Sequence, residues 1–136
     1  MKKKVVLAMC IAFFILLTGC SNAQRNTALE EAAYSVIEDK DNKEFSLSEL
    51  TAFDWDEAHL FSPYISRSDM EEQLGVKYRD KSNIVMRDDI FLLVFIKDDK
   101  VVHYAEIEHQ GSVLSTGEED YLTPSHDVIY IERYND

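Results

Sequence analysis

The chain has 136 residues, with 14 Lys and Arg against 26 Asp and Glu, so its formal charge is -12. Hydrophobic residues make up 46% and aromatic residues 11%, which is too apolar for a disordered chain, and the length predicts one domain. The acidic balance excludes a nucleic-acid binder, because contact with phosphate needs a basic face.

The first twenty residues differ from the rest of the chain. Three lysines at positions 2–4 precede thirteen residues, Val5 to Leu17, that are all apolar or Cys. This run fits the apolar region of a secretory signal peptide and falls short of the about 18–20 residues that span a bilayer. The alternatives are an ordinary signal peptide with a chance Cys and an uncleaved anchor helix.

The run ends in Leu17-Thr18-Gly19-Cys20, which resembles the lipobox of bacterial lipoproteins. The resemblance implies that residues 1–19 are a signal peptide and that Cys20 carries lipid, which would anchor the chain to the extracytoplasmic face of the cell membrane. Cleavage would also remove Cys10, so no thiol would remain for a disulfide or a cysteine metal site. The mature chain would keep 11 basic and 26 acidic side chains, a charge of -15, and would stand off from an anionic membrane.

After Cys20, residues 20–26 are predicted to be a lipidated tether and residues 27–136 a globular domain. Thr27-x-x-Glu30 is a capping box, so a helix is expected to begin at Thr27 and to end within 39–42. Its apolar face consists of Leu29, Ala32, Ala33, Val36 and Ile37.

The next elements are shorter. Residues 44–50 favour either a short strand or a turn, and residues 54–64 favour a strand that ends before Pro63. Ser66 is an N-cap residue and Gly75 suits the left-handed position after a helix, so a second helix is expected between them. Its inward residues are Met70 and Leu74.

The C-terminal half predicts three strands. The apolar run 90–96 is long enough for a strand, Asp98-Asp99 suits a two-residue turn, and 101–110 is the partner strand. This turn would place Val94 opposite His103. Residues 111–125 are expected to form a polar loop before a last strand at 127–134.

Together these elements predict a single small α+β domain, in which helix, strand and helix precede a three-stranded antiparallel meander. Both helices are expected to pack on one face of the sheet, against Ile90 and Val94. The opposite face carries Phe91, Phe95 and Tyr104, which we interpret as a semi-exposed candidate interaction surface.

The segment from Phe53 to Tyr64, with Trp55-Asp56 and Pro63-Tyr64, resembles a pattern of small bacterial lipoproteins of uncharacterised role. The resemblance extends over residues 45–105, through Leu74-Gly75 and the hairpin of residues 91–102. It implies the location and the fold, and it supplies no catalytic residues.

Candidate chemistry is sparse. His103 and His109 share one strand face and could hold a metal with Glu57 or His59, but no HxH or HExxH spacing supports this. The acidic pairs are interpreted as solvated turns, and no G-x-S-x-G nucleophile motif occurs. The sequence therefore predicts neither an enzyme nor a bound metal or cofactor.

This reasoning favours two functions and keeps an enzyme as the third. The first is a non-enzymatic binding or accessory module that lipid on Cys20 holds at the membrane. The alternative is an inhibitor or immunity-type lipoprotein that blocks a cationic exported enzyme, such as a cell-wall hydrolase. The charge of the mature chain would attract such a basic protein partner.

Overall fold

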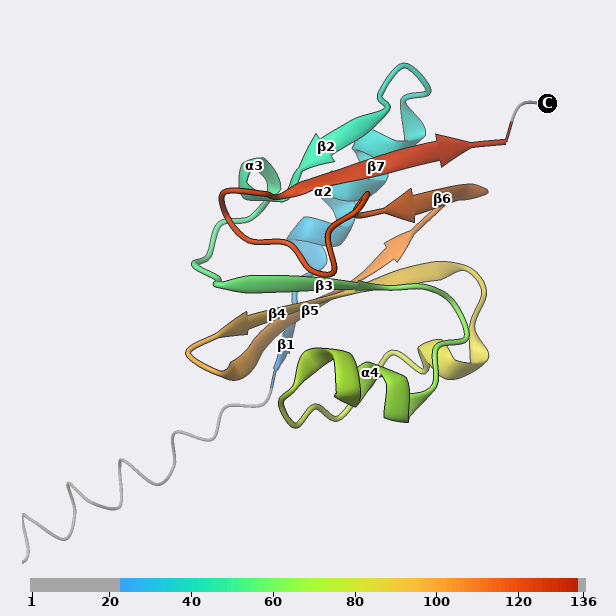
Figure 1. The fold of residues 1–136 in the computed structure, drawn as a ribbon. Helices are drawn as coiled ribbons and strands as arrows, with labels where there is room; N and C mark the ends of the chain where they lie inside the picture. Colours follow the sequence, from blue (N-terminus) through green and yellow to red (C-terminus); the bar gives the residue numbers. More distant parts are fainter. Residues whose placement is uncertain (1–22, 135–136) are drawn as a thin grey trace, which may run out of the picture.

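The computed structural model describes residues 23–134 and folds them into helices and two β-sheets (Figure 1). The first sheet has the strand order β1-β5-β4-β3 and the second has the order β2-β7-β6. The strands are β1 (Gln24–Arg25), β2 (Glu44–Ser46), β3 (Glu57–Phe61), β4 (Ile90–Lys97), β5 (Lys100–Glu108), β6 (Ser112–Ser115) and β7 (Val128–Arg133). The helices are α2 (Thr27–Glu38), α3 (Leu47–Leu50), α4 (Arg67–Leu74) and the 3-10 helix η1 (Ile84–Met86).

The α+β class and the small single domain are confirmed, but the predicted meander is wrong. The last strand, β7, pairs with β2 and β6 in the second sheet and does not join β4 and β5. The prediction failed because residues 111–125, expected to be a polar loop, contain the strand β6, with which β7 pairs. Gln110 and Gly111 have φ angles of 51° and 76°, and this left-handed turn directs the chain out of the first sheet.

The two long helices cover opposite faces of the first sheet, not one face as expected. Alternate residues of β4 belong to different cores, since successive side chains of a strand point to opposite faces. One core joins α2 with the second sheet and with Phe91, Leu93 and Phe95. The other joins α4 with Leu92, Val94 and Ile96. A central strand that is apolar on both faces needs both faces covered, and this fold covers both.

A β-bulge in β5 sets which side chains share a face. The Asp98-Asp99 turn is confirmed, with φ angles of 51° and 61°, and Ile96 pairs with Val101. Phe95 then pairs with His103, so Val102 is the extra residue of the bulge.

The expected pairing of Val94 with His103 is therefore wrong by one residue. Val94 pairs with Tyr104, and Leu92 pairs with Glu106. A slip by one residue moves a side chain to the other face of a sheet. Tyr104 accordingly lies in the α4 core, while Ala105 and Ile107 lie in the α2 core.

The N-terminal part of the domain begins earlier than expected. Gln24 and Arg25, predicted to belong to the tether, form β1, which pairs in parallel with His103 and Tyr104 of β5. The N-cap of α2 is Asn26 and not Thr27, because the Asn26 side chain accepts a hydrogen bond from Leu29 N at 2.9 Å. All strands, helices and cores described above lie within residues 23–134, so a chain that starts at Ser21 contains this whole fold.

The second long helix follows its sequence pattern closely. Ser66 caps α4 by accepting a hydrogen bond from Asp69 N at 3.1 Å, and Gly75 ends the helix with a φ of 67°. Met70 and Leu74 are its buried residues, as predicted. The strand before Pro63 is confirmed as β3, and residues 44–50 form both a short strand and the short helix α3.

Candidate functional site

The structure does not support the candidate interaction surface. Phe91 is 6% exposed, Phe95 0% and Tyr104 7%, so all three are core residues. They do not share a face either, because Phe91 and Phe95 lie in the α2 core and Tyr104 lies in the α4 core. The bulge at Val102 and the covering of both sheet faces explain this correction. Cys20, the expected lipidation site, and the expected signal peptide lie outside the described residues.

The histidines are dispersed. His59 is buried on β3, where its Nε2 lies 3.1 Å from a Glu57 carboxylate oxygen and its ring stacks on Tyr121. His103 packs against the ring of Phe53 at 4.0 Å between centroids, and burial lowers its pKa. Within residues 23–134 no three His, Cys, Asp or Glu side chains come together in a way that could hold a metal ion.

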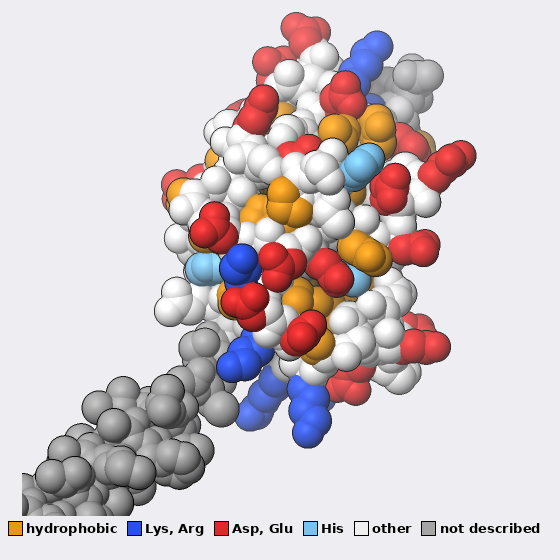
Figure 2. All heavy atoms as spheres, turned by 60° about the vertical axis from the view of Figure 1, so that its left-hand side comes forward, with side chains coloured by type: hydrophobic (Ala, Val, Ile, Leu, Met, Phe, Trp, Pro, Cys, Tyr) orange, Lys and Arg blue, Asp and Glu red, His pale blue; other side chains and the backbone are white. Residues whose placement is uncertain are grey.

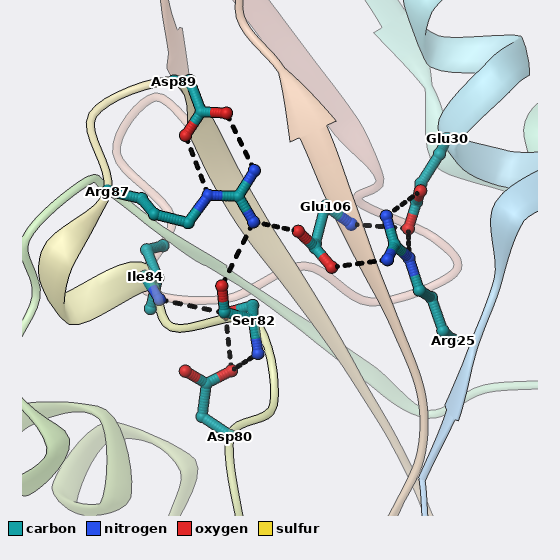
Figure 3. A network of polar contacts seen from close by, with 8 residues as sticks. All are labelled: Arg25, Glu30, Asp80, Ser82, Ile84, Arg87, Asp89 and Glu106. Carbon is teal, nitrogen blue, oxygen red and sulfur yellow. Dashed lines mark hydrogen bonds and ion pairs between the residues drawn. The ribbon is translucent and has the colours of Figure 1, made fainter.

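A network of ion pairs is centred on Glu106 of β5 (Figure 3). Glu106 is the single acidic residue that the described part of the chain buries, with 8% exposure. One carboxylate oxygen pairs with Arg87, which follows η1, and the other lies 3.1 Å from Nη1 of Arg25 on β1. The carboxylate thus lies between two arginines from segments far apart in the sequence.

Each arginine of this network has a second acidic partner. Arg87 donates to both Asp89 oxygens, at 2.9 and 2.8 Å, and this contact lowers the pKa of Asp89. Arg25 donates to both Glu30 oxygens, at 2.8 and 2.9 Å, and its own pKa is raised by this contact. Bidentate pairs of this kind fix the guanidinium plane and are stronger than single contacts.

Glu30 of α2 also completes the edge of the first sheet. Its carboxylate accepts a hydrogen bond from the backbone N–H of Glu106 at 3.0 Å. Strand β1 ends at Arg25, which pairs with Tyr104, so this N–H lies just beyond the strand pairing. The side chain of Glu30 therefore takes the place of the next residue of the edge strand.

The network joins segments that are distant in the sequence. Each oxygen of the Glu106 carboxylate is paired with a different arginine. Its effect is to hold β1, α2 and the segment before β4 against β5. A hollow of about 460 Å³ beside the network is lined by Arg25, Glu30, Arg87 and Glu106, and also by Tyr34 and Glu108.

A larger hollow, of about 740 Å³, lies where the described chain begins. Its lining includes Ala23, the apolar residues Val76 and Val101, and the rings of Tyr78 and Tyr104. Four cations surround it, which we call the basic rim: Lys77, Arg79, Lys81 and Lys100. Burial raises the pKa of Tyr78, and its buried hydroxyl has no hydrogen-bond partner in the part of the chain that the structure describes.

Charge is unevenly distributed over the surface. Figure 2 shows several Lys and Arg side chains at the lower end of the face in view, near the start of the described chain, while acidic side chains are spread over the whole face and a few other cations lie at its centre and upper end. The acidic side chains include Asp56 beside β3, which accepts a hydrogen bond from Asp98 N at 2.9 Å. That bond holds the pKa of Asp56 below its ordinary value.

Sequence reasoning missed both the Glu106 network and the basic rim. A glutamate between Ala105 and Ile107 was a visible signal, because a charged residue inside an apolar strand needs a partner when it is buried. The alternation of Lys77, Arg79 and Lys81 was visible too. Their joint position with Lys100 and the start of the domain depends on the fold.

Comparison of the chain with protein-family models, with curated proteins and with solved structures gave no match. Among the helices of residues 23–134, none has the length and apolar character needed to cross a membrane.

Proposed function

We propose that the protein is a lipoprotein held by lipid on Cys20 at the extracytoplasmic face of the membrane, where its domain serves as a non-enzymatic binding or accessory module. The observation that carries the proposal is the order of the N-terminal segments. Three lysines, a thirteen-residue apolar run and Leu-Thr-Gly-Cys are followed by a domain whose first strand starts at Gln24.

The ion pairs that join Arg25 of β1 to Glu30 and Glu106, which we call the clamp, support this proposal. A lipid at Cys20 would be separated from the first strand by only three residues, so the anchor and the domain would be closely coupled. Arg25 ties that strand to Glu30 and to Glu106. Its backbone neighbour Asn26 donates to Tyr104 O at 2.9 Å.

A pair of cysteine variants of the full chain tests the anchor. In bacteria fed an alkyne fatty acid, the wild type and Cys10→Ser are expected to take up the label and to be processed. Cys20→Ser is expected to take up no label and to remain as the precursor, because it lacks the thiol. Label on Cys20→Ser, or a mature N-terminus other than Cys20 in mass spectrometry, would refute the proposal.

The second candidate is an inhibitor of a cationic exported enzyme. Its support is the charge of -15 expected after cleavage, together with the exposed carboxylates of Asp54 and Asp56 just before β3, an edge strand of the first sheet. A basic cell-wall hydrolase that binds the chain at low salt, is released at high salt and loses activity when bound would favour this candidate. A hydrolase that stays fully active in the bound state would remove it.

A further inference from the structure

We infer that the basic rim docks the domain onto the anionic headgroups of the membrane that holds Cys20. The inference rests on the proposed anchor and adds an orientation to it. It also changes what the net charge alone predicts, which is a body that stands off from the membrane. Attraction to the membrane depends on the charges that lie close to the headgroups and not on the net charge of the whole protein.

The basic rim is positively charged, whereas the protein as a whole is negatively charged. Four cations line the hollow, against one carboxylate, that of Asp99. The carboxylate of Asp80, between Arg79 and Lys81, accepts hydrogen bonds from the backbone and hydroxyl of Ser82. Asp80 keeps its place in the count, so the four cations outnumber the two carboxylates of Asp80 and Asp99 around the hollow, in a chain with nearly twice as many acidic as basic residues.

The cations of the rim are available for a partner. Within residues 23–134, neither an ion pair nor a side-chain hydrogen bond engages any of the four, whereas Arg25 and Arg87 are both paired. Lys77, Arg79, Lys81 and Lys100 are all exposed. Cations without a partner inside the protein can bind the phosphate groups of a surface.

The length of chain between the anchor and the rim places the rim at the membrane. Ala23 lines the hollow and is three residues from Cys20. Three extended residues span about 10 Å, so lipid on Cys20 brings the hollow within about that distance of the headgroups. This is close to the Debye length of about 8 Å at physiological ionic strength, within which cations are attracted to anionic lipid.

The floor of the hollow supports the rim from below. Tyr78 and Tyr104 pack at 6.4 Å between ring centroids and lie between the rim and the apolar α4 core. Both tyrosines therefore belong to the wall between the rim and the core, and contact with headgroups is left to the four exposed cations.

The test measures which end of the domain lies near a membrane. The chain from Ser21 onward has no cysteine, so one dye can be attached at Gln73→Cys, three residues before Val76, or at Tyr134→Cys. These sites lie near the rim and at the opposite end of the domain (Figure 1). An N-terminal histidine tag holds the chain on nickel-chelating lipid in vesicles that also carry an acceptor dye.

On vesicles with phosphatidylglycerol, the ratio of energy transfer from position 73 to that from position 134 is expected to rise about twofold over phosphatidylcholine vesicles, and high salt should abolish the rise. Lys77→Glu/Lys81→Glu should return the ratio to its phosphatidylcholine value. Lys40→Glu/Lys43→Glu changes the net charge equally in the turn between α2 and β2, and should leave the rise intact.

An equal ratio on both kinds of vesicle, or an equal loss in both double variants, would overturn the inference. Because the histidine tag replaces the lipid, this result does not depend on processing at Cys20. Failure of lipidation in cells would refute the proposed anchor, whereas failure here would refute only the docking surface.

Discussion

Replacing Glu106 by Gln tests whether the ion network holds the first strand in place. The substitution keeps the shape of the side chain and removes the charge between Arg25 and Arg87. Breaking a fully buried pair costs about 3–5 kcal/mol, but these arginines are 47% and 32% exposed and water can replace part of the contact. We expect a loss of about 2 kcal/mol in the free energy of unfolding, in line with hydrogen bonds to charged groups.

Urea and thermal unfolding of the chain from Ser21 onward measure this loss. For a domain of this size, about 2 kcal/mol corresponds to a fall in Tm of roughly 8 °C. Glu108→Gln is the matched control, because Glu108 is an exposed glutamate two residues further along β5, and its loss should stay within about 0.5 kcal/mol. Amide exchange at Asn26, which donates to Tyr104 O, should accelerate in Glu106→Gln alone. Equal stability of the two variants would refute the clamp.

Two further predictions follow from burial and from a lowered pKa. Leu92 and Phe95 are both 0% exposed and lie in different cores. In urea unfolding, Leu92→Ala should therefore cost about 2–5 kcal/mol and Phe95→Ala about 3–5 kcal/mol. A loss below about 1 kcal/mol for Phe95→Ala would contradict the place of this residue in the core. Burial tends to raise the pKa of Asp127, but hydrogen bonds from Ser46 and Ser48 outweigh it and lower the pKa below 3.8. The stability that Asp127 contributes should therefore be complete above about pH 5 and be lost as the pH falls through its folded pKa. The free energy of unfolding of the wild type should therefore exceed that of Asp127→Asn above about pH 5, and this difference should become smaller as the pH falls. A difference that does not change with pH would contradict this prediction.

Elements with local start and stop signals were predictable from the sequence. Helix α4 begins after Ser66 and ends at Gly75 because each residue satisfies backbone groups of its own helix end. The Asp98-Asp99 turn is similar, since Asp tolerates positive φ and joins two long apolar strands. In both cases the determining contacts lie within a few residues in the chain.

Contacts between segments that are distant in the sequence were not predictable. Helix α2 has no basic residue in its last turn, and Arg133 of β7 instead donates to Ile37 O at 2.7 Å and to Asp39 O at 3.1 Å. The sequence around Arg133 and the sequence around the end of α2 contain no local pattern that predicts this contact. The same holds for β1, whose two residues are polar and form a strand only because β5 offers an edge.

The bulge at Val102 connects the error in the predicted surface with the site that the structure contains. Without it, Glu106 would have paired one position away and faced the α2 core, where a carboxylate would have met only apolar side chains. With it, Glu106 lies on the face of Leu92, where Arg25 and Arg87 reach it from either side. One extra residue in β5 thus moves Tyr104 into the α4 core and turns a glutamate inside an apolar strand into the clamp for the N-terminal strand. If Cys20 carries lipid as proposed, that clamp fixes the path from the anchor to the sheet, and the basic rim is the surface that this path brings to the membrane.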